Sequence, residues 1–137
     1  MALRATIGFA FGESDEGVAY VRLWGSLEAE YVQRIPVSLR VRPALLGRDG
    51  AYAALLAVAT ALRKQGLRAL DFEVADEALV RDLTDHRPVP EALGVPYVLL
   101  GCELNRFKAA SVRLGDAATC RDLSARARAD ISIHVAA

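Results

Sequence analysis

An apolar helical stretch, residues 49–66 (DGAYAALLAVATALRKQG), most constrains what this chain can fold into. Both sides of the predicted helix are apolar, because one carries large apolar residues and the other carries alanines. A helix that is apolar nearly all round is buried on more than one side. We therefore expect a central helix with a sheet on one face and other helices, or a partner chain, on the other. The main apolar stripe at helical spacing consists of Tyr52, Leu55, Leu56, Ala59 and Leu62.

The two ends of this helix carry ordinary start and stop signals. Asp49 can cap the first free backbone amides. Arg63 and Lys64 fall in the last turn, where the helix dipole favours cations. Gly66 follows at the position that accepts the left-handed backbone conformation. The boundaries of the predicted helix are therefore Asp49 and Gly66.

Three consecutive strands are predicted before the helix. Residues 3–11 and 18–24 are joined by a short polar turn, which indicates a hairpin. A third strand covers about residues 30–41 and contains Pro36. Because proline cannot donate to the hydrogen-bond ladder, this strand should lie at a sheet edge or carry a bulge.

Strands and helices alternate after the central helix. Residues 67–74 alternate as a strand does, and a right-handed crossover would place this strand parallel to one of the first three. A short helix is predicted over residues 76–85. The continuous apolar run 95–102 (VPYVLLGC) favours a buried parallel strand. Asp116 is a candidate cap for a last helix over residues 117–129.

Two segments have no clear place in this scheme. Residues 103–114 show neither helical nor strand periodicity plainly. In the tail, residues 131–137, apolar residues alternate as in a short strand that we cannot assign to a sheet position.

Composition limits the classes of protein to which the chain can belong. A length of 137 residues with 53% hydrophobic and 25% charged residues predicts a single globular domain over residues 1–137. The net charge of zero does not indicate a strongly basic nucleic-acid binder, so an anion site must come from local clustering. Cys102 and Cys120 have no metal-ligand spacing and are expected to be free thiols. With no signal peptide or membrane-length apolar run, we expect a cytoplasmic protein without membrane contact.

The order of elements is three strands, helix, strand, helix, strand, helix. It predicts an α/β fold with a mixed five-stranded sheet and helices on both faces; the strand order 3-2-1-4-5 is what the resemblance described next implies. Over residues 3–129 this arrangement resembles the ribonuclease H-like fold, in which the third strand lies at the sheet edge, as Pro36 requires. The run Ala53–Leu62 is similar to the pattern of the family's first helix, and Phe11 and Gly12 stand where the family has an Asp-Gly pair.

The resemblance implies a two-metal site of four carboxylates, and this chain lacks at least two of them. Phe11 replaces the aspartate of the first strand, and Ala54, or Tyr52 in another register, replaces the glutamate of the first helix. Asp76 matches the aspartate after the fourth strand, and Asp122 lies near the place of the fourth aspartate. Two carboxylates bind Mg²⁺ only weakly. The resemblance thus predicts a domain that has largely lost hydrolysis and binds RNA, an RNA–DNA hybrid or a protein partner.

A second hypothesis is an active nuclease with a different metal site. Glu13, Asp15 and Asp76 are the candidate metal ligands, with Asp122 and Glu73 completing the set. Mg²⁺ or Mn²⁺ would then be the cofactor, whereas the non-catalytic domain needs none. Asp76 could instead serve as the N-cap of the short helix.

Basic residues around one aromatic suggest where nucleic acid could bind. Arg106, Lys108 and Arg113 flank Phe107, and this pattern suits a surface that tracks a phosphate backbone. The same residues could form an ordinary solvated edge. A third hypothesis is an assembly module, because the apolar helix and the apolar tail could pair across a homodimer.

Overall fold

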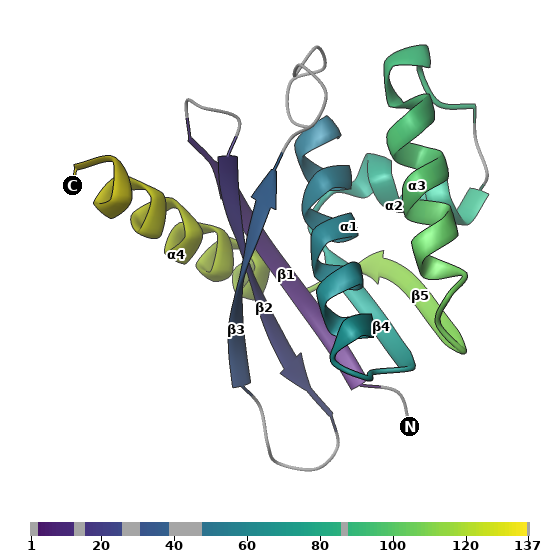
Figure 1. The fold of residues 1–137 in the computed structure, drawn as a ribbon, viewed down its shortest axis with the longest axis horizontal. Helices are drawn as coiled ribbons and strands as arrows, with labels where there is room; N and C mark the ends of the chain where they lie inside the picture. Colours follow the sequence, from purple (N-terminus) through teal and green to yellow (C-terminus); the bar gives the residue numbers. More distant parts are fainter. Residues whose placement is uncertain (1–2, 13–15, 26–30, 39–47, 86–87, 137) are drawn as a thin grey trace.

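A five-stranded sheet with helices on both faces forms the frame of the computed structural model, which describes residues 3–12, 16–25, 31–38, 48–85 and 88–136 (Figure 1). None of the described helices is long and apolar enough to cross a membrane. In chain order the elements are β1 (Leu3–Phe11), β2 (Glu16–Trp24), β3 (Tyr31–Ser38), α1 (Arg48–Lys64), β4 (Ala69–Val74), α2 (Glu77–Asp85), the 3₁₀ turn η1 (Glu91–Leu93), α3 (Gly94–Leu104), β5 (Ala109–Leu114) and α4 (Ala117–Ala136).

The strand order is β3-β2-β1-β4-β5, which confirms the predicted sheet. β1 pairs antiparallel with β2, and β2 pairs antiparallel with β3, whereas β4 runs parallel to both β1 and β5. β3 lies at the edge, and its Pro36 pairs with Val18. The edge placement predicted from the proline is therefore confirmed.

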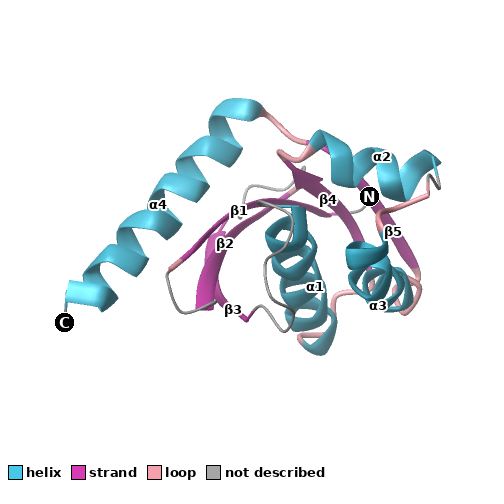
Figure 2. Ribbon diagram, turned by 90° about the horizontal axis from the view of Figure 1, so that it is seen from above, coloured by secondary structure: helices cyan, strands magenta, loops and turns pink. Residues whose placement is uncertain are grey.

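Helices cover both faces of the sheet, with α1 and α3 on one side and α4 on the other (Figure 2). Tyr52, Leu55 and Leu62 of α1 are fully buried between the sheet and its neighbouring helices. The central helix that its apolar composition predicts is confirmed. Its end is also as predicted, because Gly66 has a φ of 95° and the N–H of Leu67 donates to the carbonyl of Leu62 at 3.2 Å.

The prediction of a buried strand over residues 95–102 is wrong, because this run lies in helix α3. A short apolar run does not distinguish a buried strand from a helix by periodicity. The overlooked signal was Pro96, which stands in the first turn of α3, where its missing N–H costs no hydrogen bond. The fifth strand is instead β5, within the segment 103–114 that showed no clear period.

The prediction of a strand in the tail is also wrong, since α4 continues to Ala136. Ile131 packs with a small cluster in which Val18 and Tyr20 of β2 contact α4. The helix approaches the sheet closely at Gly8, where an added Cβ would lie 2.3 Å from the backbone nitrogen of Ser124. The alternation of apolar residues in the tail therefore belongs to a helix that crosses β1 and β2.

Candidate functional site

The carboxyl ends of β1 and β4 lie beside the start of α1, at one end of the sheet (Figure 1). The resemblance places metal-binding carboxylates here. Phe9 and Phe11 occupy this end of β1, with ring centroids 5.8 Å apart in an edge-to-face arrangement. An added Cβ on Gly50 would lie 2.9 Å from the Phe11 ring. Strand and helix therefore meet through aromatic rings and bare helical backbone, which we call the Phe9–Phe11–Gly50 contact.

The two remaining aspartates of the predicted site have different surroundings. Asp76 is half-buried, and its Oδ1 accepts a hydrogen bond from the N–H of Leu79 at 3.0 Å, which is an N-cap of α2. Asp122 is exposed in α4. Ala54 and Tyr52, the two candidate positions for the helix glutamate, are both buried.

Of the other carboxylates proposed for a metal site, the structure describes only Glu73. Glu13 and Asp15 lie outside the described residues. Glu73 is buried on the sheet face opposite Phe9, where it accepts a hydrogen bond from Thr6 at 2.8 Å and lies 3.6 Å from Arg113. Within the part of the chain that the structure describes, no group of three or more His, Cys, Asp or Glu residues could hold a metal ion.

A buried carboxylate near the same end, Asp82 of α2, has a structural role. Its Oδ2 accepts a hydrogen bond from the Tyr52 hydroxyl at 2.7 Å and contacts Nη2 of Arg48 at 2.5 Å. Burial, followed by the hydrogen bond to Asp82, raises the pKa of Tyr52. This ion pair fastens α2 to the first turns of α1.

The opposite end of the sheet is basic. We call Lys64, Arg68, Arg106 and Lys108 the basic cluster, and all four are exposed. They are brought together because α1 and α3 both end here while β4 and β5 both begin here. The backbone N–H of Lys108 donates to the carbonyl of Arg68 at 2.9 Å.

A buried ion pair holds this basic end together. The guanidinium of Arg63, at the end of α1, donates to the buried carboxylate of Glu103 in α3. Arg106 lies farther from the same carboxylate, at 3.8 Å. The Glu103 carboxylate therefore pairs mainly with Arg63 and leaves the charges of the basic cluster largely uncompensated.

The structure brings together two of the four residues predicted to bind nucleic acid. Arg106 and Lys108 belong to the basic cluster. The ring of Phe107 is only 6% exposed and packs edge-on against Phe72 at 5.7 Å, so it anchors the turn and presents no face to a base. Arg113 lies farther along β5, with Nη2 3.0 Å from Oδ2 of Asp71. Sequence reasoning missed the contribution of Lys64 and Arg68, which depends on the pairing of β4 with β5.

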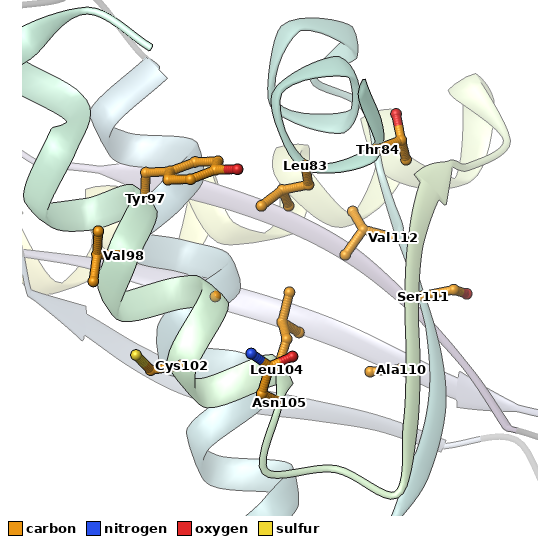
Figure 3. Close-up of a pocket in the computed structure, with 11 residues that line it drawn as sticks. Leu83, Thr84, Tyr97, Val98, Cys102, Leu104, Asn105, Ala110, Ser111 and Val112 are labelled. Atoms are coloured by element: carbon orange, nitrogen blue, oxygen red, sulfur yellow. The ribbon is translucent and has the colours of Figure 1, made fainter. Parts of the chain in front are cut away.

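A pocket of about 530 Å³ lies between α2, α3 and β5 (Figure 3). Its lining carries no charged side chain. It therefore lacks the ligands for a metal ion and the cations for a phosphate group. The lining is mostly apolar, and its side-chain oxygen and nitrogen atoms come from Thr84, Tyr97, Asn105 and Ser111.

No protein-family model matches the chain, and no curated protein matches it. Solved structures do match it over nearly the whole length. RNase H1 from Halobacterium salinarum NRC-1 is 17% identical, with a TM-score of 0.68 over 95% of this chain and 99% of that one. The N-terminal RNase H domain of rv2228c from Mycobacterium tuberculosis is 15% identical, with a TM-score of 0.63 over 99% and 100%. LC11-RNase H1, solved in complex with an RNA/DNA hybrid, is 11% identical, with a TM-score of 0.68 over 91% and 95%.

Proposed function

We propose that this chain, which has the ribonuclease H-like fold, is a nucleic-acid-binding domain that does not hydrolyse its ligand. The observation that carries the proposal is the Phe9–Phe11–Gly50 contact. A two-metal site needs carboxylates that converge on both ions. At this contact Phe9 and Phe11 present aromatic rings and Gly50 has no side chain, so none of the three offers a side-chain oxygen to a metal. The carboxylate of the neighbouring Asp49 is buried and accepts a hydrogen bond from the N–H of Gly50 at 3.0 Å.

Among the residues that the structure describes, the two aspartates of the predicted site have surroundings that do not favour a metal pair. Asp76 already accepts the hydrogen bond that caps α2, and Asp122 is exposed on α4. Mg²⁺ prefers six oxygen ligands and is usually held by one or two carboxylates together with waters and substrate phosphates. A single transient ion on these groups fits that chemistry, but a clamped pair does not.

The basic cluster is the surface proposed to bind the ligand. Exposed Lys and Arg side chains neutralise phosphates without reading sequence, and binding of this kind weakens as salt rises. The similarity in fold to LC11-RNase H1, which was solved with an RNA/DNA hybrid, supports RNA or an RNA–DNA hybrid as the ligand class. The zero net charge does not conflict with this, because four of the 17 Lys and Arg residues form a local cluster at this end.

Retardation of a labelled RNA–DNA hybrid on native gels at several salt concentrations tests this proposal. The triple variant Lys64→Gln, Arg68→Gln and Lys108→Gln should bind at least about tenfold more weakly and show a smaller salt slope, because each lost phosphate contact removes about 0.9 from the slope on duplex DNA. Equal binding by this variant and the wild type would contradict the proposed surface.

A matched control removes the same charge elsewhere. Arg81, Arg121 and Arg128 are exposed on α2 and α4, away from the basic end. Replacing all three with Gln lowers the net charge by the same three units. This control should keep most of the affinity if location matters and should lose as much as the first variant if only total charge matters.

The rival hypothesis, an active nuclease, predicts a different result for the same hybrid. Metal-dependent cleavage that disappears in Asp76→Asn would support it. The substitution preserves an oxygen that can cap α2, so loss of cleavage would not reflect loss of the helix. If the hybrid is neither cleaved nor retarded, the result would favour a protein-assembly module.

A further inference from the structure

The outer face of α3 is apolar and uncovered. Val95, Val98 and Leu99 are 65%, 59% and 48% exposed, and Cys102 is exposed beside them. Their spacing puts all four on one side of the helix. We call them the α3 stripe. Of the large hydrophobic residues exposed in the described part of the chain, half lie in this stripe, and the full set is Tyr31, Val32, Val95, Val98, Leu99 and Leu114.

The side of α3 that faces α1 is already used by the fold. Leu100 is fully buried, and Glu103 is buried and bonded to Arg63 of α1. The α3 stripe is therefore a second apolar face that the core of this chain does not need. An apolar face of this kind, bordered by charged residues, is typical of an interaction site.

The charges at the two ends of the stripe have opposite sign. Glu91 lies four residues before Val95, and Arg106 lies four residues after Cys102. Both are exposed. Glu91 lies in η1 and Arg106 in the turn after α3. Along the sequence they are equally far from the centre of the stripe, which lies between Val98 and Leu99.

We propose that a second copy of this chain docks on the α3 stripe, with the two α3 helices antiparallel about a twofold axis. In this register Val95 faces Cys102 of the second copy, and Val98 faces Leu99. The twofold axis repeats each contact, as in an isologous interface. A continuous apolar seam results, and it buries the groups that the monomer exposes.

Charge complementarity favours a second copy over an unrelated partner. In the antiparallel register Glu91 faces Arg106 of the second copy, and the axis generates a second identical pair. A parallel arrangement would set Glu91 against Glu91 and Arg106 against Arg106. The Arg106 guanidinium is only loosely held within its own chain, at 3.8 Å from Glu103, so it can turn towards Glu91 of the second copy.

The dimer does not depend on nucleic-acid binding. Lys64, Arg68 and Lys108 lie outside the stripe, so most of the basic cluster stays exposed when the stripe is covered. The dimer predicted from the sequence was assigned to the central helix and the tail. The interface proposed from the structure is the α3 stripe, which includes no residue of the central helix or of the tail.

Charge reversal tests both the register and the identity of the partner. Sedimentation of wild type should show a dimer, while Glu91→Arg and Arg106→Glu each place like charges across both ends of the seam. Each variant alone should dimerise at least about tenfold more weakly, a loss that corresponds to about 1.4 kcal/mol. An equimolar mixture of the two variants should recover the dimer, because a mixed pair restores opposite charges at both ends.

Three results would overturn the proposal. The first is a wild type that stays monomeric at about 1 mM, where a complex with a Kd of about 1 mM would be substantially formed. The second is a dimer that neither charge reversal weakens. The third is a mixture of the two variants that does not recover the dimer, provided that circular dichroism shows both variants folded.

A disulfide variant gives an independent test. The register sets residue 95 opposite Cys102, so Val95→Cys should form a covalent dimer under a mild oxidant, because facing residues come within the Cα separation that a disulfide spans. In a Cys102→Ser background the same substitution should not cross-link, since residue 95 then lies about seven residues, or about 10 Å, along the axis from its symmetry mate. Cross-linking that persists without Cys102 would contradict the register.

Discussion

The two ends of the parallel strands differ in how their charged side chains are used. At the carboxyl ends of β1 and β4, Asp76 caps α2 and Asp82 binds Arg48 and Tyr52, so both carboxylates have partners within the fold. At the amino ends of β4 and β5, the basic cluster is exposed. The carboxylates at one end therefore hold the fold together, whereas the cations at the other end face solvent and are free of that role.

The ion pair at the carboxyl end should give the largest effect on stability. Asp82→Ala leaves Arg48 and Tyr52 without their shared acceptor and should cost about 3 kcal/mol, because breaking a buried pair strands the remaining polar groups. Urea denaturation measures the change. A cost below about 0.5 kcal/mol, the range of surface substitutions, would mean that this carboxylate is not structural.

Restoring a carboxylate at the strand end should also destabilise the protein. Phe11→Asp removes a ring from the Phe9–Phe11–Gly50 contact and should cost about 2 kcal/mol, because the lost apolar contact is half-buried. Phe11→Leu keeps an apolar side chain and should cost less than about 1.5 kcal/mol. If Phe11→Asp were as stable as wild type and bound Mn²⁺, the aromatic contact would not be what excludes the metal site.

The role of Asp76 separates a cap from a metal ligand. Asp76→Ala should lower the free energy of unfolding by about 1 kcal/mol, whereas Asp76→Asn should be nearly neutral, because an amide oxygen can still accept the Leu79 N–H. Thermal unfolding of the two variants provides the comparison. If both variants were equally destabilised, the negative charge of Asp76, and not its hydrogen bond to the Leu79 N–H, would be what stabilises the fold.

Neutralising the basic end should have little effect on stability. The variant Lys64→Gln, Arg68→Gln and Lys108→Gln changes only exposed residues, and each substitution should cost less than about 0.5 kcal/mol. Its unfolding curve in urea should nearly overlay that of wild type. A large loss would show that both ends of the sheet are structural and would remove the contrast between them.

Alkaline pH should lower the stability of the protein through groups whose pKa the fold raises, with no effect at neutral pH. The pKa of Tyr52 is raised by burial and by Asp82, and that of Cys120 is raised by burial and by Glu73. Both groups therefore stabilise the folded state fully below their ordinary pKa values, and the stability is lost as pH rises above about 9 to 10, where only the unfolded chain ionises. Denaturation from pH 7 to 11 should show a plateau and then a fall. Stability that rises over this range would contradict the assignment.

Sequence reasoning succeeded where the signal is local and failed where it depends on partners. The hairpin, Pro36 and the capped apolar helix supported the resemblance to the ribonuclease H-like fold, and that resemblance implied the observed strand order. Helix α3 was mistaken for a strand because both of its faces are apolar, one towards α1 and the other in the exposed α3 stripe, so the helical period is hidden. With that error, β5 could not be placed.

The candidate sites also separate into features that depend on local sequence and features that depend on strand pairing. The assignment of Phe11 and Ala54 to the carboxylate positions depends only on residue identity within a matched pattern, and it stays a prediction. The position of Glu73 could not be predicted, because the sheet face it occupies is decided by pairing with Thr6. Grouping Lys64 and Arg68 with Lys108 likewise required the register of β4 and β5.

The measurement that tests the central claim most directly is a time course of a labelled RNA–DNA hybrid with Mg²⁺ or Mn²⁺, resolved in parallel on denaturing and native gels. The account predicts an intact hybrid on the denaturing gel and a retarded, salt-sensitive complex on the native gel. Cleavage that requires the metal and disappears in Asp76→Asn would contradict it, because carboxylates would then assemble a working metal site at the end of the sheet where the Phe9–Phe11–Gly50 contact lies.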